Sequence, residues 1–336
     1  MMLKYCNYKI SELAQITGVT SPLISRHFKD KDNEHIIRKN NRVIGLMPEA
    51  VEEYLISSGV MPFQSSITLS ANLCGGVGKT TSIYNLGIAL RRITNRKTPI
   101  IYIDGDSQAS FTSIIFGEPA EDKEPILIDF FERKASVDDI LTHIKDNIWF
   151  IKSNLNQVWL EKTLSKPKEV KEGVLNLYKE LFRKFGKKIH IFQDHTPQLS
   201  ALFSSSICAL HQLGSDVIKS VVIPIRSDKF AIQGGDYIIK EMDEIKETFS
   251  FNGDIKIHCF FSTIDRRIST TADAFKLAKS HKNIIDNLSS LVIRYCSEVP
   301  KSIMSNSNVY SKSASNNAAE DYQDLLLSIF NKNNSV

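Results

Sequence analysis

The sequence lacks the features that would identify several classes of protein. It has only five cysteines in 336 residues, and no two of them stand at the C-x-x-C spacing of a zinc or redox site. No run approaches the ~18 apolar residues needed to cross a bilayer, and the first ten residues contain no apolar core of a secretory signal. The formal net charge of +4 is too small to indicate nucleic-acid binding by itself. We therefore expect a cytoplasmic protein with reduced cysteines and no membrane partner.

What the composition does contain is typical of a globular protein. Apolar residues make up 42% of the chain and charged residues 24%, a balance that excludes a wholly disordered or collagen-like chain. At roughly 150 residues per domain, a chain of 336 residues predicts about two domains. We expect a small domain over residues 1–60, a linker over 61–66 and a larger domain over 67–336.

The first sixty residues have the pattern of a winged helix-turn-helix. Gly18 ends a first short helix, and Ser21, followed by proline, starts a second, whose Leu23 is expected to face the first. Apolar pairs flank a basic segment within 36–44, as in a hairpin wing, and a third helix is expected over 48–57. The second helix of such a unit can enter a DNA major groove.

Basic residues are concentrated in this region. Residues 1–45 hold eight Lys and Arg against four Asp and Glu, a local excess equal to that of the whole chain. The side chains expected to contact DNA are Arg26, Lys29, Arg38, Lys39 and Arg42. The alternative is a small dimerisation module whose charged hairpin is simply solvated.

From residue 66 onward, apolar segments typical of buried strands alternate with helical segments. Strands are expected over 66–72, 98–106, 148–152, 188–193, 220–225 and 255–261, and a helix over 79–92. This alternation predicts an α/β domain with a mostly parallel sheet, doubly covered by helices. In such sheets ligands bind beyond the carboxyl ends of the strands, where the informative residues of this chain lie.

A glycine-rich loop follows the first of these strands. Three of the chain's 15 glycines fall within four residues before a helix, where backbone N–H groups and the helix dipole can bind an anion. Lys79 is expected to reach the β- and γ-phosphates of a nucleotide, and the Thr80 hydroxyl to bind Mg²⁺. The loop is not a strict G-x-x-x-x-G-K-[ST] match, because residue 73 is leucine. The candidate nucleotide-binding residues are Cys74, Gly75, Gly76, Val77, Gly78, Lys79, Thr80 and Thr81.

Further motifs follow the loop in order along the chain. They are I-D-G-D-S-Q at 103–108, D-H-T-P at 194–197, V-V-I-P-I and F-A-I-Q-G within 221–234, T-I-D-R-R at 263–267, V-P-K-S at 299–302 and A-A-E-D-Y at 318–322. Together with the loop they resemble the ParA/MinD family of ATPases, whose deviant Walker A loop reads K-G-G-x-G-K-[ST]. The resemblance runs from about residue 66 to residue 330 and implies a P-loop NTPase fold with ATP and Mg²⁺ as cofactors.

The resemblance also implies roles for the acids at the strand ends. Asp194 matches the acid that holds Mg²⁺, Asp106 matches the acid that positions the attacking water, and Asp104 lies nearer the metal. The implied catalytic residues are thus Lys79, Asp106 and Asp104, and the implied metal ligands are Thr80, Asp104 and Asp194. Pro300 and Lys301 match a segment of the family that adjoins the nucleotide. The alternative is that these acids only cap strand ends or solvate turns.

Cys74 departs from the family, which has a lysine there that reaches the phosphates of the dimer partner. Cysteine is short and supplies no fixed positive charge, so the resemblance implies an ATP hydrolase that binds ATP and turns it over slowly. Lys152 is one candidate for a replacement cation. The alternative for Lys152 is an ordinary surface lysine.

By resemblance, the function is partition of plasmid or chromosomal DNA. An ATP-dependent sandwich homodimer would bind DNA non-specifically, and a ParB-like centromere-binding adaptor would stimulate hydrolysis and release. Residues 256–283, with six Lys and Arg against two Asp, form a candidate DNA surface that includes Lys276 and Lys279. Such a protein would associate with the nucleoid in the cytoplasm, and the first domain could also bind an operator.

Two other functions stay open. One is an ATP-sensing transcriptional repressor with weak or no hydrolysis, and the other is an ATPase that positions a protein cargo. A membrane role is disfavoured, because the helix expected from residue 318 places acids beside its apolar face. The Ser- and Asn-rich stretch over 302–317 is expected to form a mobile loop.

Overall fold

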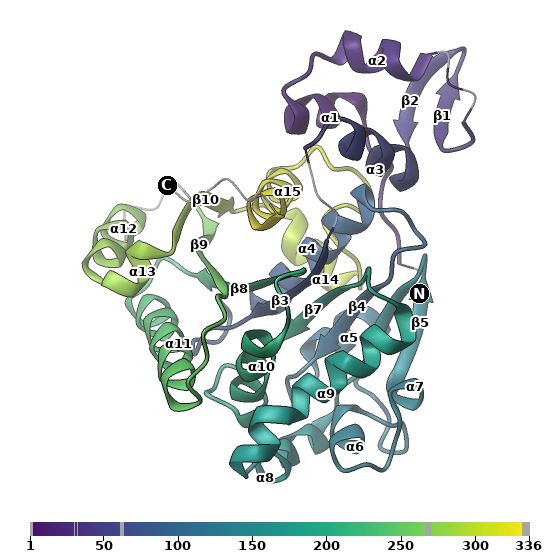
Figure 1. Ribbon diagram of the computed structural model, residues 1–336. Helices are drawn as coiled ribbons and strands as arrows, with labels where there is room; N and C mark the ends of the chain where they lie inside the picture. Colours follow the sequence, from purple (N-terminus) through teal and green to yellow (C-terminus); the bar gives the residue numbers. More distant parts are fainter. Residues whose placement is uncertain (1–2, 30, 32, 61–63, 266–269, 331–336) are drawn as a thin grey trace.

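The computed structural model describes residues 3–29, 31, 33–60, 64–265 and 270–330 (Figure 1). Positions 61–63 of the expected linker, and Arg266 and Arg267 of the basic segment, lie outside the described residues. Within the described part of the chain, no helix has the length and apolar character to cross a membrane.

The larger part of the protein is built on one sheet of eight strands in the order β10-β9-β8-β3-β7-β4-β6-β5. Its neighbouring strands run parallel, except that the edge strand β5 pairs antiparallel with β6. A mostly parallel sheet is therefore confirmed, with an antiparallel edge that the sequence did not reveal. The strands are β3 (Ser65–Ser70), β4 (Ile100–Asp104), β5 (Leu141–Lys145), β6 (Ile148–Ile151), β7 (His190–Asp194), β8 (Val217–Ile225), β9 (Lys256–Ile264) and β10 (Leu288–Arg294).

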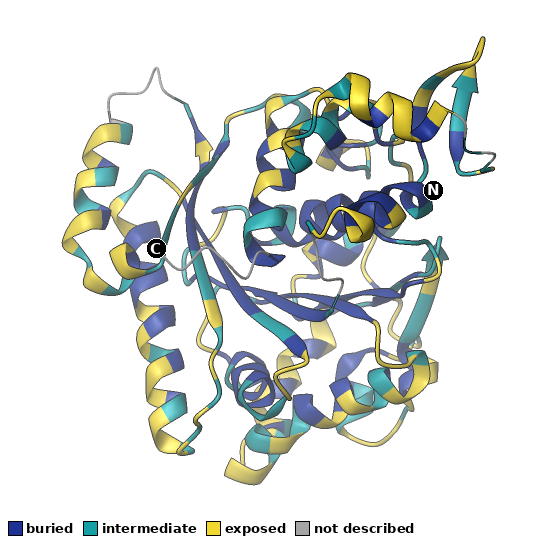
Figure 2. Cartoon of the chain, turned by 45° about the horizontal axis from the view of Figure 1, so that its top comes forward, coloured by how far each residue is buried: buried dark blue, intermediate teal, exposed yellow. Residues whose placement is uncertain are grey.

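Apolar side chains that alternate along the strands belong to two hydrophobic cores, one on each face of the sheet. In β4, Ile101 and Ile103 belong to the hydrophobic core on one face of the sheet, whereas Ile100 and Tyr102 belong to the core on the other face. Figure 2 shows the central strands dark blue, with exposed residues gathered on the outer sides of the helices. A sheet covered on both faces leaves its loop-bearing ends as the place for a ligand.

Helices and one short 3-10 segment connect these strands. They are α4 (Lys79–Ile93), α5 (Ser110–Phe116), α6 (Leu127–Phe131), α7 (Val137–Ile140), η1 (Leu155–Trp159), α8 (Leu160–Thr163), α9 (Pro167–Phe185), α10 (Ala201–Gln212), α11 (Lys229–Thr248), α12 (Thr270–Ser280), α13 (Lys282–Asp286), α14 (Glu298–Met304) and α15 (Asn317–Phe330). Residues 302–317, expected to form a mobile loop, are partly packed into the protein, because Asn308, Val309 and Tyr310 are buried.

The first residues form a small unit of three helices and a hairpin. Its elements are α1 (Ile10–Thr17), α2 (Ser21–Lys29), β1 (Ile36–Lys39), β2 (Arg42–Leu46) and α3 (Pro48–Ser57). Gly18 ends α1 with a positive φ of 68°, as its place in the sequence predicts. Ile24 and Phe28 of α2 are buried, but Leu23 is 53% exposed, so the prediction that Leu23 faces α1 is wrong.

This N-terminal unit packs against the larger part instead of standing apart from it. Its apolar residues belong to the same hydrophobic cluster as α4, α15 and one face of β4. The buried Arg92 of α4 donates to Glu12 of α1 over 2.7 Å, and its guanidinium lies 4.6 Å from the Tyr8 ring and 4.9 Å from the Tyr310 ring. Strand β3 begins at Ser65, so the last two residues of the expected linker belong to the sheet.

Candidate functional site

The glycine-rich loop joins the carboxyl end of β3 to α4, whose first residue is Lys79. Gly76 and Gly78 have φ values of +69° and +95°, conformations in which glycine avoids the strain of a side chain. Gly75 and Gly76 are exposed, whereas Val77 is buried and holds the loop on the core. The loop therefore presents open backbone at the N-terminus of a 15-residue helix, an arrangement suited to phosphate.

Thr80 and Asp194 meet beside this loop. Asp194 ends β7, which is paired directly with β3, and its Oδ2 accepts a hydrogen bond of 2.5 Å from the Thr80 hydroxyl. Its Oδ1 is buried and has no hydrogen-bond partner among the described residues. Burial raises the pKa of Asp194 and the nearby Asp104 adds to the rise, although Thr80 and Lys79 oppose it. An unpartnered buried carboxylate oxygen next to a threonine hydroxyl fits a divalent cation with oxygen ligands.

Lys79 points its ammonium group back into the loop. Its Nζ donates to the Cys74 carbonyl oxygen over 3.0 Å, and the residue is buried. Burial lowers the pKa of Lys79, and the carboxylates of Asp194 and Asp106 counter that effect. A cation held by a loop carbonyl in this way is available to an incoming anion.

Asp104 lies beside Asp194 on the neighbouring strand, but its oxygens are already engaged. Oδ2 accepts from the backbone N–H of Thr112 at 2.8 Å and from its hydroxyl at 2.6 Å, and Oδ1 accepts from the Asp106 N–H at 3.1 Å. Burial raises the pKa of Asp104 to about 6, although the bonds from Thr112 lower it. These contacts shape the β4–α5 loop, and this bonding suggests a positioning role for the residue.

Asp106 is the more open of the two acids in this loop. Its Oδ1 accepts from the Gln108 N–H at 2.9 Å, and its carboxylate interacts electrostatically with Lys79 and Asp194. The structure therefore brings Lys79, Thr80, Asp106 and Asp194 to one place, with Asp104 directly behind them.

Two supports of the loop were not apparent from the sequence. The Asn72 side chain donates to the Pro224 and Ala231 carbonyls and accepts from the Cys74 N–H, so it ties the loop to β8 and α11. A Cβ on Gly234 would lie 2.5 Å from Asn72 Oδ1, which explains why the F-A-I-Q-G motif needs its glycine. The Ser262 hydroxyl at the end of β9 donates to the Val77 carbonyl over 2.7 Å.

A third feature of the site is His195, directly after Asp194. It is buried, and both its ring nitrogens lack a hydrogen-bond partner among the described residues. Burial lowers the pKa of His195 to about 3, and Lys79 contributes to the lowering. A neutral imidazole therefore lies behind the loop.

Comparison with known proteins agrees with this geometry. Residues 65–257, more than half of the chain, match the model of a family described as AAA domain. The chain belongs to this family. Among curated relatives, an uncharacterised protein of Methanocaldococcus jannaschii, MJECL24, is 28% identical over 56% of this chain and 68% of its own length. An uncharacterised protein of Mycobacterium tuberculosis, Rv1708, is 23% identical over 63% of this chain and 62% of its own length.

Solved structures share the fold of this AAA-domain protein at low sequence identity. McdA from Cyanothece matches with a TM-score of 0.63 and 15% identity over 80% of this chain and all of McdA. A Borrelia burgdorferi protein assigned to plasmid partition, bound to AMPPNP, matches with a TM-score of 0.58 and 18% identity, over 80% of this chain and 98% of its own. Cobyrinic acid a,c-diamide synthase from Mycobacterium smegmatis, with ADP and magnesium, matches with a TM-score of 0.59 and 18% identity, over 78% of this chain and 92% of its own. The fold is that of the ParA/MinD-type P-loop ATPases.

The other nucleotide-binding candidates lie on a different element. Pro300 and Lys301 belong to α14, which follows the edge strand β10, and both are exposed. The Lys301 ammonium pairs with Glu298 over 3.0 Å. A contact of these two residues with the nucleotide stays a prediction.

The candidate DNA-binding residues fall on two surfaces. Arg26 and Lys29 are exposed on α2, and Lys39 and Arg42 are exposed at the hairpin tip. Arg38 is half-buried and donates to the carbonyls of Phe28 and Lys31, so it ties α2 to the hairpin. Lys276 and Lys279 are exposed on α12, at the opposite edge of the sheet from β5.

Lys152, the candidate replacement cation, is engaged elsewhere. Its Nζ pairs with Glu124 over 3.0 Å and lies 4.6 Å from the centre of the Phe116 ring. Its side chain is only 17% exposed. These contacts give Lys152 a structural role, which differs both from a free replacement cation and from the ordinary surface lysine of the alternative.

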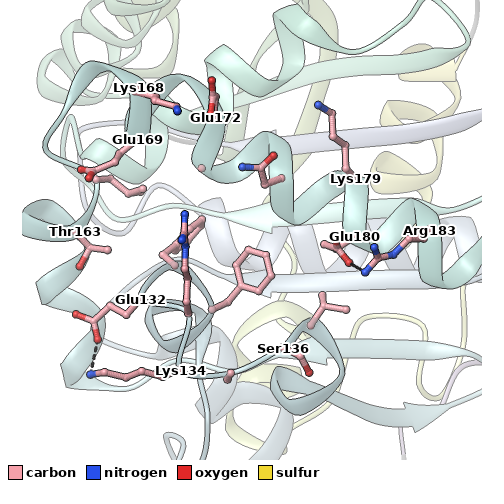
Figure 3. Close-up of a pocket in the computed structure, with 18 residues that line it drawn as sticks. Glu132, Lys134, Ser136, Thr163, Lys168, Glu169, Glu172, Lys179, Glu180 and Arg183 are labelled. Carbon is pink, nitrogen blue, oxygen red and sulfur yellow. Dashed lines mark hydrogen bonds and ion pairs between the residues drawn. The ribbon is translucent and has the colours of Figure 1, made fainter.

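A cavity of about 960 Å³ lies away from the loop, between the segment at 130–137 and helix α9 (Figure 3). Its walls carry charges of both signs, including Lys134 paired with Glu132 and Arg183 paired with Glu180. Because the loop residues do not line it, this cavity is not the nucleotide site.

Proposed function

We propose that this protein is a Mg²⁺-dependent ATP hydrolase that partitions DNA as a nucleotide-sandwich dimer. The observation that carries the proposal is the meeting of Lys79, Thr80, Asp106 and Asp194 at the head of α4, beside open loop backbone. This constellation provides backbone amides and a lysine for phosphates, and a hydroxyl and a carboxylate for a metal. The ADP- and AMPPNP-bound neighbours support ATP as the nucleotide.

The same residues account for the metal. The Thr80 hydroxyl would ligate Mg²⁺ directly, and Asp194, with its unpartnered Oδ1, would hold it through water. When bound, the ion neutralises charge that develops on the transferring phosphoryl group. Asp106, which interacts electrostatically with Lys79, would orient the attacking water, and Asp104 would hold that loop in shape by accepting from the Asp106 N–H.

Exposed apolar side chains support a dimer formed over the loop. Leu155, Leu199, Phe230 and Met304 follow the carboxyl ends of β6, β7, β8 and β10, and they are 72%, 46%, 74% and 88% exposed. Because β6, β7, β8 and β10 run parallel to β3, their carboxyl ends lie at the same side of the sheet as the glycine-rich loop. A second copy of the chain would cover these side chains and exclude water from the phosphates.

DNA binding is assigned to two surfaces. The exposed cations of α12 would hold the phosphate backbone without sequence preference, and α2 would enter a major groove at an operator. A ParB-like adaptor would stimulate hydrolysis and release the dimer from DNA. Such a cycle moves the adaptor-bound cargo over the nucleoid.

The proposal is tested by steady-state ATPase assays of the full chain with and without DNA. We expect slow Mg²⁺-dependent turnover that DNA stimulates, and its loss in Lys79→Ala. Lys276→Ala with Lys279→Ala should lower the slope of log affinity against log salt by about two, because each lost phosphate contact contributes about one. Lys166→Ala is the matched control, because Lys166 is an exposed lysine paired with Glu169 in the same way as Lys276 is paired with Asp273. ATP turnover that neither DNA nor Mg²⁺ affects would refute the proposal.

A repressor is the second candidate, and the exposure of Arg26 and Lys29 on α2 favours it. It predicts sequence-specific operator binding by the full chain without ATP turnover. In that case Cys74→Lys, which puts a cation on the loop, would gain activity over the wild type. Turnover in the wild type that Cys74→Lys leaves unchanged would exclude this candidate.

A further inference from the structure

The end of strand β8 brings an arginine to the glycine-rich loop. Arg226 follows Ile225, the last residue of β8, which pairs with β3. A Cβ placed on Gly76 would lie only 3.5 Å from Arg226 Nη1, and Cys74 is among the groups that interact electrostatically with the guanidinium. The side chain is 48% exposed, so it stands at the open side of the loop instead of within the core.

The loop itself is poor in positive charge. Residues 74–78 are cysteine, glycine and valine, and the ammonium of Lys79 is turned towards the Cys74 carbonyl. A phosphoryl group in transfer spreads negative charge over three oxygens, and enzymes of this chemistry commonly use a further cation there, supplied by the same chain or by a partner. Among the described residues, Lys152 is engaged with Glu124, whereas Arg226 lies against the loop and adds a cation to that of Lys79.

Asp228 holds the guanidinium in place. Arg226 Nε donates to Asp228 Oδ2 over 2.6 Å, and Asp228 Oδ1 caps α11 by accepting from the Ala231 N–H at 3.0 Å. One carboxylate therefore fixes the arginine to the start of a 20-residue helix. Among the described residues, the hydrogen bond of the guanidinium is made through Nε, which leaves the two terminal nitrogens for an anion.

We propose that Arg226 is a catalytic cation that acts within its own subunit, where its terminal nitrogens contact the γ-phosphate of ATP beside Gly76. This inference rests on the proposed ATPase function. In the step it assists, a water oxygen bonds to the γ-phosphorus while the bond to the β–γ bridging oxygen breaks. The electron pair of that bond stays on ADP, one proton of the water is released, and the other remains on inorganic phosphate. The guanidinium stays charged throughout and stabilises the equatorial oxygens.

The test compares Arg226→Gln, Arg226→Lys and the wild type in the full chain. Single-turnover hydrolysis gives the chemical rate, and fluorescence titration with mant-ATP gives the affinity. We expect Arg226→Gln to slow hydrolysis by at least about 100-fold, as loss of a transition-state donor does. Affinity for mant-ATP should stay within about threefold, because the contact strengthens mainly in the transition state. Arg226→Lys keeps the positive charge but lacks the planar guanidinium, so its hydrolysis rate should lie between those of Arg226→Gln and the wild type.

Arg183→Gln is the matched control, because Arg183 is an exposed arginine paired with the carboxylate of Glu180 on α9. It should leave both readouts unchanged. Hydrolysis by Arg226→Gln at the wild-type rate would overturn the inference and leave the ATPase proposal intact. Equal losses in affinity and rate would also overturn it, since they would assign Arg226 to ground-state binding. A wild type that binds mant-ATP but never hydrolyses ATP would contradict the ATPase proposal as well.

Discussion

The ion pair between Arg92 and Glu12 gives a sharp test of how the N-terminal unit is attached. Arg92 has a fully buried side chain, and its guanidinium bonds Glu12 over 2.7 Å and the Cys6 carbonyl over 3.1 Å. The change Glu12→Gln removes the negative charge and leaves the arginine charged in the core. Breaking a buried pair in this way typically costs 3–5 kcal/mol. Because Glu12 is 19% exposed and the two tyrosine rings remain, we expect the lower end of that range, about 3 kcal/mol.

A matched pair in the same unit serves as the control. Lys31 and Glu53 lie 2.9 Å apart but are 36% and 56% exposed, so Glu53→Gln should cost less than about 1 kcal/mol. Thermal unfolding followed by circular dichroism at pH 7 should show Glu12→Gln melting roughly 5 °C lower than the wild type and Glu53→Gln almost unchanged. Adding Arg92→Met to Glu12→Gln should recover most of the loss, because an apolar side chain has no charge to bury. Equal losses in the two single variants would refute the reasoning.

Three further outcomes are expected. Gly87→Ala should destabilise the protein by about 1–3 kcal/mol, because its Cβ would overlap the buried ring of Tyr102, and an unchanged denaturation midpoint would contradict this. Burial lowers the pKa of His190 to about 3, whereas an unfolded histidine titrates near 6.5. The unfolded state therefore binds more protons, and stability should fall below pH 6.5 by roughly 2 kcal/mol at pH 5 on this account. Melting curves at pH 7 and pH 5 should show that His190→Asn loses less stability than the wild type on acidification. The control His143→Asn, which changes an exposed histidine, should lose as much as the wild type. Equal losses in both variants would contradict the assignment of this pH dependence to His190. Asp194→Asn should weaken the effect of Mg²⁺ on nucleotide affinity in calorimetric titrations with and without EDTA, and an undiminished Mg²⁺ effect would show that Asp194 does not help to hold the metal.

Local patterns predicted the elements that carry strong periodicity. The third helix occupies Pro48–Ser57 as expected, and the strand at 148–152 was placed to within one residue. Edge strands were missed because they are half-buried and polar: β5 reads L-T-H-I-K, and β10 begins with a leucine and two serines. A signal for β5 existed in Asp146 and Asn147, whose φ values of +49° and +57° make the turn into β6.

The site was predictable where one motif supplies the chemistry, and not where distant segments meet. The loop and the acids at strand ends were identified, because parallel strands bring their carboxyl ends together. The Gln157 side chain donates to the Asp104 carbonyl over 3.0 Å, and the Arg226 side chain lies near Gly76. These two pairs join segments that are 53 and 150 residues apart. Composition and spacing contain no information on such pairs, because only the packing of the sheet brings them together.

Helix α4 links the glycine-rich loop to the N-terminal unit. Its first residues, Lys79 and Thr80, lie at the nucleotide loop, and Arg92 in its last turn is buried against the N-terminal unit. Just beyond it, the Asn95 N–H donates to Glu52 of α3 over 2.9 Å. Fifteen helical residues span about 22 Å, so the loop and the docked unit are held at a set separation by one element. A unit attached in this way cannot reorient on α4 without exposing the buried charge of Arg92, and DNA bound by α2 would therefore take a defined position relative to the nucleotide.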